Sequence, residues 1–189
     1  MSAQDSKLFV ISGPSGAGKG TLVTRVRERR SNLGLTVSAT TRAPRKGEVD
    51  GVNYFFLTRE EFDRRVANGE FVEWAEVHGN CYGTLVSEVA SKLASGASLI
   101  LEIDVQGALQ VKERFPEAVL IFIKPPSLEV LRERLVGRGT ETSETIELRM
   151  ANAADELALA DRYDDVVVND DLDRATDELV RVLDMHERI

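Results

Sequence analysis

The amino-terminal part of the chain contains the segment LFVISGPSGAGKGT, which runs from Leu8 to Thr21. Its first four residues form an apolar run that ends at Gly13-Pro14, and this pattern predicts a short buried strand. From Gly18 to Arg30 the apolar residues recur at the spacing of one helical face. The segment therefore predicts a strand, a glycine-rich turn and a helix, which is the context that a phosphate-binding P-loop requires.

The residue types in this turn suit a phosphate group. Glycines let successive backbone N–H groups point inward, and the amino terminus of a helix favours an anion. Lys19 would add a point charge for the terminal phosphates of a nucleoside triphosphate. The alternative is an ordinary strand–turn–helix corner with a lysine present by chance, but the flanking strand and helix favour the phosphate-binding interpretation.

The turn departs from the P-loop pattern at one position. A Ser or Thr whose hydroxyl ligates magnesium usually follows the lysine, and this chain has Gly20 there, with Thr21 next. We therefore predict no direct protein ligand for Mg²⁺. Phosphate oxygens of the nucleotide and waters would hold the ion, Thr21 would bond a phosphate, and an acid such as Asp104 would contact a metal-bound water. Two alternatives remain open, namely ligation by Thr21 and a loop impaired by Gly20.

Strand-like and helix-like segments alternate through much of the remaining chain. The predicted strands are Ser98 to Ile103, Val119 to Ile123 and Val166 to Val168, and the predicted helices are Val105 to Arg114, Leu128 to Val136 and a closing helix that follows Asp170-Asp171. The two aspartates can cap that last helix. This alternation predicts an α/β fold, in which helices cover both faces of a parallel sheet.

Residues of about 35 to 90 have a different character. Thr36 to Lys46 is rich in threonine, arginine and proline and predicts a loop, whereas Tyr54 to Leu57 and Glu70 to Val77 predict short strands. Between them, Thr58-Arg59-Glu60-Glu61 has the spacing of a capping box and predicts the start of a helix. We therefore expect a small α+β insertion in the α/β core. A second interruption, the polar segment Gly137 to Thr142, lies between two helices.

The composition of the 189 residues fits one globular domain. A net charge of −8 disfavours a nucleic-acid partner. The longest apolar run, Ala118 to Ile123, is too short to cross a membrane, so we expect no membrane partner. The single cysteine, Cys81, has no partner for an internal disulfide, which favours a reducing compartment and a cytoplasmic location. The sequence does not indicate an oligomeric state.

A second chemical signal lies in the predicted insertion. Arg42 and Arg45 are three residues apart, the second after a proline, and two guanidinium groups at this spacing can converge on one phosphate. The phenolic hydroxyls of Tyr54 and Tyr82 would suit a phosphate monoester. The alternative is a solvated loop with aromatic residues in a core.

Taken together, these motifs resemble the guanylate kinases, the ATP:GMP phosphotransferases, over nearly the whole chain. The segments that carry the resemblance are Gly13–Thr21, Ser38–Glu48, Glu73–Ala75, Gly79–Thr84, Glu102–Gly107, Gly137–Glu141 and Val168–Asp171. The resemblance implies a P-loop kinase core with a five-stranded parallel sheet, formed by residues 1–35, 91–136 and 144–189. It also implies a GMP-binding insertion at 36–90 and a mobile lid at 137–143.

The resemblance assigns roles to individual residues. It implies that ATP contacts Gly13, Pro14, Ser15, Gly16, Ala17, Gly18, Lys19, Gly20 and Thr21, with Asn169 near the base. It implies that the GMP phosphate meets Arg42, Arg45, Tyr54 and Tyr82, and that guanine faces Ser38, Glu73, Thr84 and Asp104. The implied catalytic groups are Lys19, Arg42, Arg134, Arg138 and Arg149. For Asn169 a helix cap is an alternative, and for the helix arginines the alternative is local ion pairing with Glu133 or Glu147.

The chemistry of Glu73 supports guanine independently of the family. Guanine presents N1–H and N2–H₂ donors beside the O6 acceptor, and one carboxylate can accept from both donors. The hydroxyls of Ser38 and Thr84 can serve O6 or N7, whereas adenine has a lone pair at N1 that a carboxylate would repel. The alternative for Glu73 is an exposed carboxylate on a strand.

We therefore expect an enzyme that transfers the γ-phosphoryl group of ATP, with Mg²⁺, to GMP and dGMP. An inactive guanylate-kinase-like binding module is the alternative from another class, and the intact glycines and Lys19 speak against it. A monophosphate kinase of other base specificity is the third hypothesis, and Glu73 argues against it.

Overall fold

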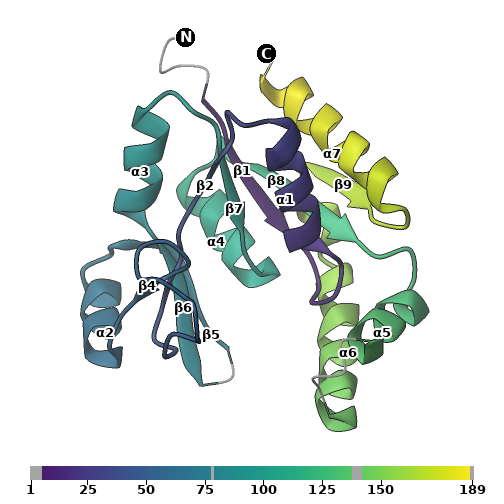
Figure 1. Ribbon diagram of the computed structural model, residues 1–189, viewed down its shortest axis with the longest axis horizontal. Helices are drawn as coiled ribbons and strands as arrows, with labels where there is room; N and C mark the ends of the chain where they lie inside the picture. The colour runs from purple at the N-terminus through teal and green to yellow at the C-terminus, as the bar shows by residue number, and fades with distance from the viewer. Residues whose placement is uncertain (1–5, 78, 138–141, 188–189) are drawn as a thin grey trace.

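In the computed structural model, which describes residues 6–77, 79–137 and 142–187, a five-stranded parallel sheet forms the centre of the molecule (Figure 1). Its strands, in spatial order, are β2 (Gly34–Leu35), β7 (Leu99–Glu102), β1 (Leu8–Ser12), β8 (Val119–Lys124) and β9 (Asp165–Val168). All neighbours in this order pair in parallel. This arrangement confirms the predicted fold class.

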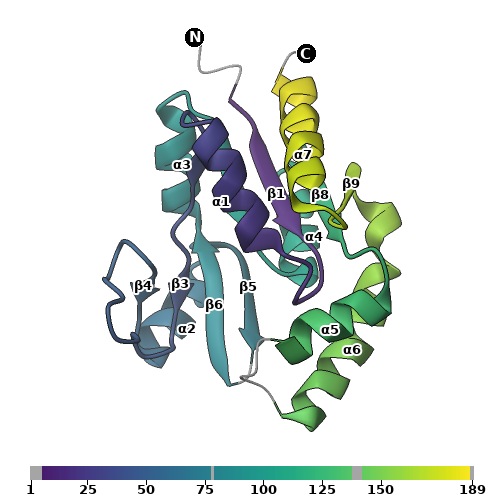
Figure 2. The ribbon, with the colours of Figure 1, turned by 45° about the vertical axis from the view of Figure 1, so that its right-hand side comes forward.

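Helices cover both faces of this sheet, because alternate residues of a strand point to opposite faces. On one face, Phe9 and Ile11 of β1 pack in a core with α1 (Lys19–Arg29) and α7 (Leu172–Glu187), which lie side by side (Figure 2). On the other face, Leu8 and Val10 pack with α3 (Val86–Ala94), α4 (Val105–Arg114) and the 3₁₀ turn η1 (Ala160–Arg162). None of the described helices combines the length and apolar content needed to cross a membrane.

The strand β9 differs from the buried strand that the run of three valines predicts. Val166 and Val168 are 40% and 37% exposed, and only Val167 is buried. The reason is position, because β9 is the outermost strand on its side of the sheet. The predicted cap of the following helix is confirmed, since the side chain of Asp171 accepts a hydrogen bond from the backbone N–H of Arg174 (2.9 Å).

A second sheet lies within residues 36–90. Its order is β4 (Phe55–Phe56), β3 (Ala39–Thr40), β6 (Asn80–Leu85) and β5 (Phe71–Val77), and α2 (Arg59–Ala67) packs on it. The side chain of Thr58 accepts from the backbone N–H of Glu61 (3.2 Å), so the predicted helix start is confirmed. The segment predicted as a loop, Thr36 to Lys46, contains β3. That strand forms through pairing with the distant Tyr82 and Gly83, which local sequence patterns do not reveal.

The helices α5 (Leu128–Gly137) and α6 (Ser143–Leu157) form a pair with their own apolar contacts. The buried residues of this pair are Leu131, Leu135, Ile146, Met150 and Ala153. In Figure 2, this helix pair and the second sheet both lie beyond the carboxyl end of β1, with the segment between β1 and α1 close to both. The predicted lid at 137–143 falls largely on residues 138–141, which lie outside the described part of the chain.

Candidate active site

The turn between β1 and α1 has a backbone conformation that requires glycine. Gly13 and Gly18 have φ angles of 143° and 91°. A Cβ at Gly13 would lie 2.3 Å from the carbonyl oxygen of Ile123, and a Cβ at Gly18 would lie 2.4 Å from Nδ2 of Asn169. The turn is therefore packed tightly between the end of β8 and the side chain that follows β9.

Lys19 begins α1 directly after this turn, and its ammonium group folds back over it. Nζ donates to the carbonyl oxygens of Gly13 (2.6 Å) and Pro14 (3.1 Å). A pocket of about 300 Å³, here called the phosphate-loop pocket, is lined by Ser15, Gly16, Gly18, Lys19, Gly20, Thr21 and Glu102. Nearly all of its lining comes from the predicted ATP-binding segment.

The sequence indicates Glu102, together with Asp104, as an acid that ends a core strand beside the turn, where carboxylates commonly face ligands and metal-bound water. Glu102 ends β7, beside Ile11 of β1, and its side chain is open to the phosphate-loop pocket. Oε1 lies 3.3 Å from the position that a Cβ of Gly20 would occupy. The surrounding protein desolvates the carboxyl group and raises its pKa, while the nearby charge of Lys19 opposes this effect. An acid at the end of a parallel strand beside the loop was the available sequence signal.

A second pocket, of about 290 Å³, adjoins the first and is here called the Glu73 pocket. Five predicted GMP-binding residues line it: Ser38, Tyr54, Glu73, Tyr82 and Asp104. Lys19 and Glu102 line it as well, so the two pockets meet at these side chains. Asp104 has a structural task too, since its Oδ1 accepts from the backbone N–H of Gly107 (2.9 Å) and caps α4.

Glu73 is buried, with 4% of its surface exposed, in contrast to the exposed carboxylate that was the alternative. Its Oε1 accepts a hydrogen bond of 2.7 Å from the hydroxyl of Thr84, directly across the β5–β6 pair. Oε2 lies 2.8 Å from the position of a Cβ at Gly107, so only glycine leaves room for it. Burial raises the pKa of Glu73 to about 7, and the charge of Asp104 adds to the rise.

The two arginines of the insertion have different settings. The Arg42 guanidinium forms an ion pair with Glu48 (2.9 Å) and lies 5.4 Å from the ring centroid of Tyr54, which lines the Glu73 pocket. The side chain of Arg45 is exposed, while its backbone N–H donates to Glu48 (2.6 Å). Neither arginine lines the Glu73 pocket itself, but Arg42 lies beside Tyr54, which does line it.

Arg134 and Asn169 meet on the back of the phosphate-loop turn. Nη2 of Arg134 donates to the carbonyl oxygen of Asn169 (2.7 Å), and Nδ2 of Asn169 donates to that of Ala17 (2.8 Å). Asn169 thus anchors the turn, and Asp171 makes the helix cap instead. Arg132 forms the ion pair with Glu147 that was one of the expected alternatives. The predicted catalytic Arg138 lies outside the described residues.

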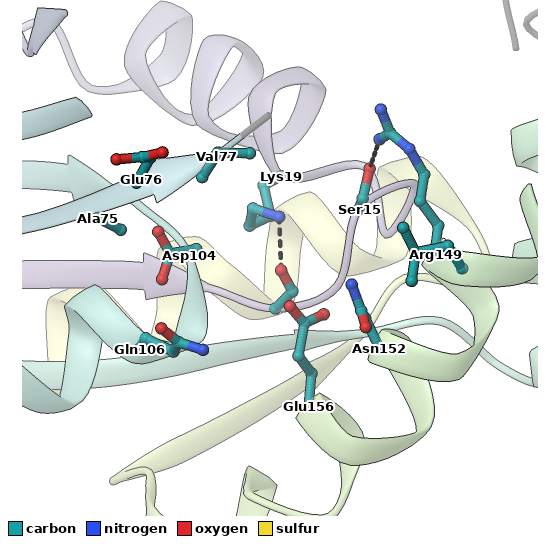
Figure 3. A pocket seen from close by; sticks show the side chains of 12 residues that line it. Ser15, Lys19, Ala75, Glu76, Val77, Asp104, Gln106, Arg149, Asn152 and Glu156 are labelled. Carbon is teal, nitrogen blue, oxygen red and sulfur yellow. Dashed lines mark hydrogen bonds between the residues drawn. The ribbon is translucent and has the colours of Figure 1, made fainter. Parts of the chain in front are cut away.

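A larger cleft of about 500 Å³ separates the second sheet from α6, with the phosphate-loop turn at its floor (Figure 3). Arg149 of α6 donates to the hydroxyl of Ser15 across this cleft. Four polar lining residues had no predicted role in the site, namely Glu76, Gln106, Asn152 and Glu156. Gln106 lies in the Glu102–Gly107 segment that carries the resemblance, whereas Asn152 and Glu156 stand on α6 outside any motif, and burial raises the pKa of Glu156.

A phosphate-binding turn that opens a helix, joined at one lysine to a second pocket with a buried carboxylate, places the chain among the P-loop nucleoside monophosphate kinases. The family model described as guanylate kinase matches residues 5–186, and the chain belongs to this family.

Individual relatives agree over nearly the full length. The chain is 52% identical to a guanylate kinase of Halalkalibacterium halodurans, over 97% of this chain and 90% of the relative. It is 56% identical to a guanylate kinase of Gloeobacter violaceus, over 94% of this chain and 87% of that relative. Among solved structures, the guanylate kinase of Anaplasma phagocytophilum superposes with a TM-score of 0.77 at 37% identity, covering 96% of this chain and 86% of that one.

Proposed function

We propose that the protein transfers the γ-phosphoryl group of ATP to GMP, and to dGMP, yielding ADP and GDP or dGDP. The observation that carries this proposal is the buried carboxylate of Glu73, held by Thr84 in a pocket that opens onto Lys19 of the phosphate-loop turn. A carboxylate in that setting can accept from both N1–H and N2–H₂ of guanine.

The proposed base recognition uses the pairing between Glu73 and Thr84. When ionised, a carboxylate only accepts hydrogen bonds, so the Thr84 hydroxyl satisfies one of its oxygens and leaves capacity for guanine. Adenine would place its N1 lone pair against this anion. Ser38 on the same pocket would supply a hydroxyl to O6 or N7.

The proposed phosphoryl transfer relies on cationic side chains around the turn. Charge develops on the oxygens of the moving group, and donors fixed in advance stabilise it. Lys19 would meet the terminal phosphates of ATP, and Arg42 would meet the phosphate of GMP together with Arg45, Tyr54 and Tyr82. Arg134 and Arg149, with Arg138 of the predicted lid, would approach from α5 and α6. The attacking phosphate oxygen of GMP is already anionic, so no general base is required.

The residues at the turn fit a magnesium ion carried by ATP. Oxygen ligands suit Mg²⁺, and the carboxylates of Glu102 and Asp104 end β7 and begin α4 next to the turn. Among the described residues there is no group of three or more Asp, Glu, His or Cys side chains that could hold a metal. Bound with ATP, the ion would neutralise phosphate charge.

ATP and GMP are the proposed partners, and the proposed location is the cytoplasm. The net charge of −8 supports small nucleotides over nucleic acid as ligands. The lone thiol, Cys81, is buried and unbridged, which fits a reducing compartment.

A panel of acceptors tests the proposal. ADP release would be followed by a coupled assay with Mg²⁺-ATP and, in turn, GMP, dGMP, AMP, CMP and dTMP. We expect turnover with the two guanine nucleotides only, and its loss by about 10³-fold in Lys19→Ala. Turnover with another base would overturn the assigned specificity, and no turnover with any acceptor would favour a binding module.

A further inference from the structure

We propose that Gly20 and Glu102 are a compensating pair. The absent side chain at position 20 makes room for the carboxylate of Glu102, which takes over the magnesium-directed task that a hydroxyl after the lysine has in the P-loop pattern. The inference rests on the proposed function, because the ion in question accompanies ATP.

The first support is that Gly20 has no conformational reason to be glycine. It lies in the first turn of α1, and it is not among the glycines of positive φ. A glycine within a helix lowers stability by about 1 kcal/mol relative to alanine. A helix position that carries glycine without using its backbone freedom therefore calls for a spatial reason.

The spatial reason is the carboxylate of Glu102. A Cβ at position 20 would lie 3.3 Å from Oε1 and 3.7 Å from Oε2, so the carboxylate would have to shift by a few tenths of an ångström to accept a side chain there. Both residues line the phosphate-loop pocket, together with Lys19 and Thr21. The carboxylate thus occupies the neighbourhood in which a hydroxyl at position 20 would stand.

The second support is that the carboxylate of Glu102 is available to a ligand in the phosphate-loop pocket. Within the described part of the chain, its side chain is engaged in no hydrogen bond or ion pair shown by the structure, although Lys19 is close enough to influence its pKa. Its side chain is open to the pocket, so its oxygens are available to a ligand there. By contrast, Asp104 already uses Oδ1 to cap α4. Of the two acids at this strand end, Glu102 is therefore the better placed for a magnesium-bound water.

The proposed pairing also explains why position 102 carries a glutamate and not the shorter aspartate. Glutamate extends its carboxylate one methylene further than aspartate, and the free space above Gly20 accepts that extension. A serine at position 20 would fit a shorter acid at position 102. Substitutions at positions 20 and 102 should then preserve magnesium binding only when they are combined, and a double-mutant cycle measures this coupling.

The experiment measures binding and not turnover. Isothermal titration calorimetry gives the dissociation constant of the non-hydrolysable analogue AMP-PNP with Mg²⁺ and with EDTA, and their ratio is the magnesium gain. We expect Gly20→Ser and Glu102→Asp each to reduce this gain by about 5- to 10-fold. The double variant should recover the gain to within about twofold of wild type, because a serine hydroxyl then accompanies a shorter acid.

A matched control distinguishes the effect of added volume at position 20 from the effect of the serine hydroxyl. Gly20→Ala combined with Glu102→Asp adds the Cβ without the hydroxyl, and its magnesium gain should stay low. Glu102→Gln keeps the size of the side chain, so it should fold normally and lose the gain. The pairing is wrong if the losses of Gly20→Ser and Glu102→Asp simply multiply in the double variant, or if Glu102→Gln retains the full gain. If AMP-PNP binding shows the magnesium gain and the coupling between positions 20 and 102, but the wild-type protein makes no GDP from GMP, the proposed function is overturned while the pairing of Gly20 with Glu102 stands.

Discussion

The hydroxyl of Thr84 donates a 2.7 Å hydrogen bond to Oε1 of Glu73 across the β5–β6 strand pair. This contact fixes a carboxylate that is almost completely buried and whose second oxygen packs against Gly107. No cationic side chain of the described residues forms an ion pair with this carboxylate, so burial disfavours the charged form and raises the pKa of Glu73 to about 7. A buried acid of this kind lowers the stability of the folded protein at neutral pH, and two predictions depend on it.

The first prediction concerns stability. Because the folded pKa of about 7 lies above the ordinary value of 4.5 for a glutamate, the proton on Glu73 stabilises the folded state fully below pH 4.5, and this contribution disappears as the pH rises through 7. Glu73→Gln cannot ionise and keeps the size of the side chain. We expect it to lie within about 1 kcal/mol of wild type at pH 5 and to be more stable at pH 8, by up to about 3 kcal/mol. Urea unfolding at both pH values measures this, and parallel pH dependences of the two proteins would contradict it.

The second prediction concerns the base. Glu73→Gln replaces a double acceptor with a group that presents one donor to guanine, so we expect GMP binding to weaken by about 10- to 150-fold. AMP-PNP binding should change little. Wild type should also bind GMP more tightly as the pH rises through about 7, because the ionised form is the one that accepts from guanine. Calorimetry with each nucleotide gives these values, and equal losses for both would show that Glu73 supports the fold and not base recognition.

Local patterns in the sequence predicted most of the core, although not β2 or α3. The apolar run before Gly13, the capping box at Thr58 and the alternation of strands and helices depend on neighbours in the chain, and the structure has the corresponding elements. The strand β3 escaped prediction because it forms through pairing with β6, about 40 residues further along the chain. Similarly, the contact between Gly20 and Glu102 joins α1 to β7, and spacing in the sequence carries no trace of it.

Arg42 provides the third prediction. Its guanidinium lies beside Tyr54 at the edge of the Glu73 pocket and pairs with Glu48. The phosphate of a bound monophosphate would displace Glu48 from this guanidinium or bind it alongside Glu48. In Arg42→Ala the binding free energy of GMP should weaken by about 1.5–3 kcal/mol, while the affinity for guanosine stays unchanged, since only GMP carries the phosphate. Arg64→Ala is the matched control, because that arginine is exposed on α2, pairs with Glu61 and has no predicted contact with GMP. A comparable loss of guanosine affinity in Arg42→Ala would mean that the arginine shapes the pocket instead of binding phosphate.

The fourth prediction concerns the contact between Gly18 and Asn169. An alanine at position 18 would bring its Cβ to 2.4 Å from Nδ2 of Asn169 and would also have to adopt a φ angle of 91°. We expect Gly18→Ala to lose ATP affinity and to be destabilised by about 2 kcal/mol or more. Gly96→Ala separates the two causes, because Gly96 has a φ of 79° but open space around it. If urea unfolding finds both variants equally destabilised, the contact with Asn169 contributes nothing beyond the backbone strain.

The last prediction is closure of the central cleft, which the division into core, insertion and lid implies. Val77 of β5 and Leu148 of α6 are 40% and 54% exposed, and both line the cleft above Lys19. Water in such a cleft would compete with GMP for the phosphoryl group, so an active kinase must exclude it when both nucleotides are bound. Small-angle X-ray scattering should therefore give a smaller radius of gyration with a linked adenosine–guanosine bisubstrate analogue than for the free protein. AMP-PNP alone serves as the control, because one nucleotide leaves the other side of the cleft without a ligand to close upon. An unchanged radius with the bisubstrate analogue, at a precision that resolves hinge motions, would show that the insertion and α6 stay apart during catalysis.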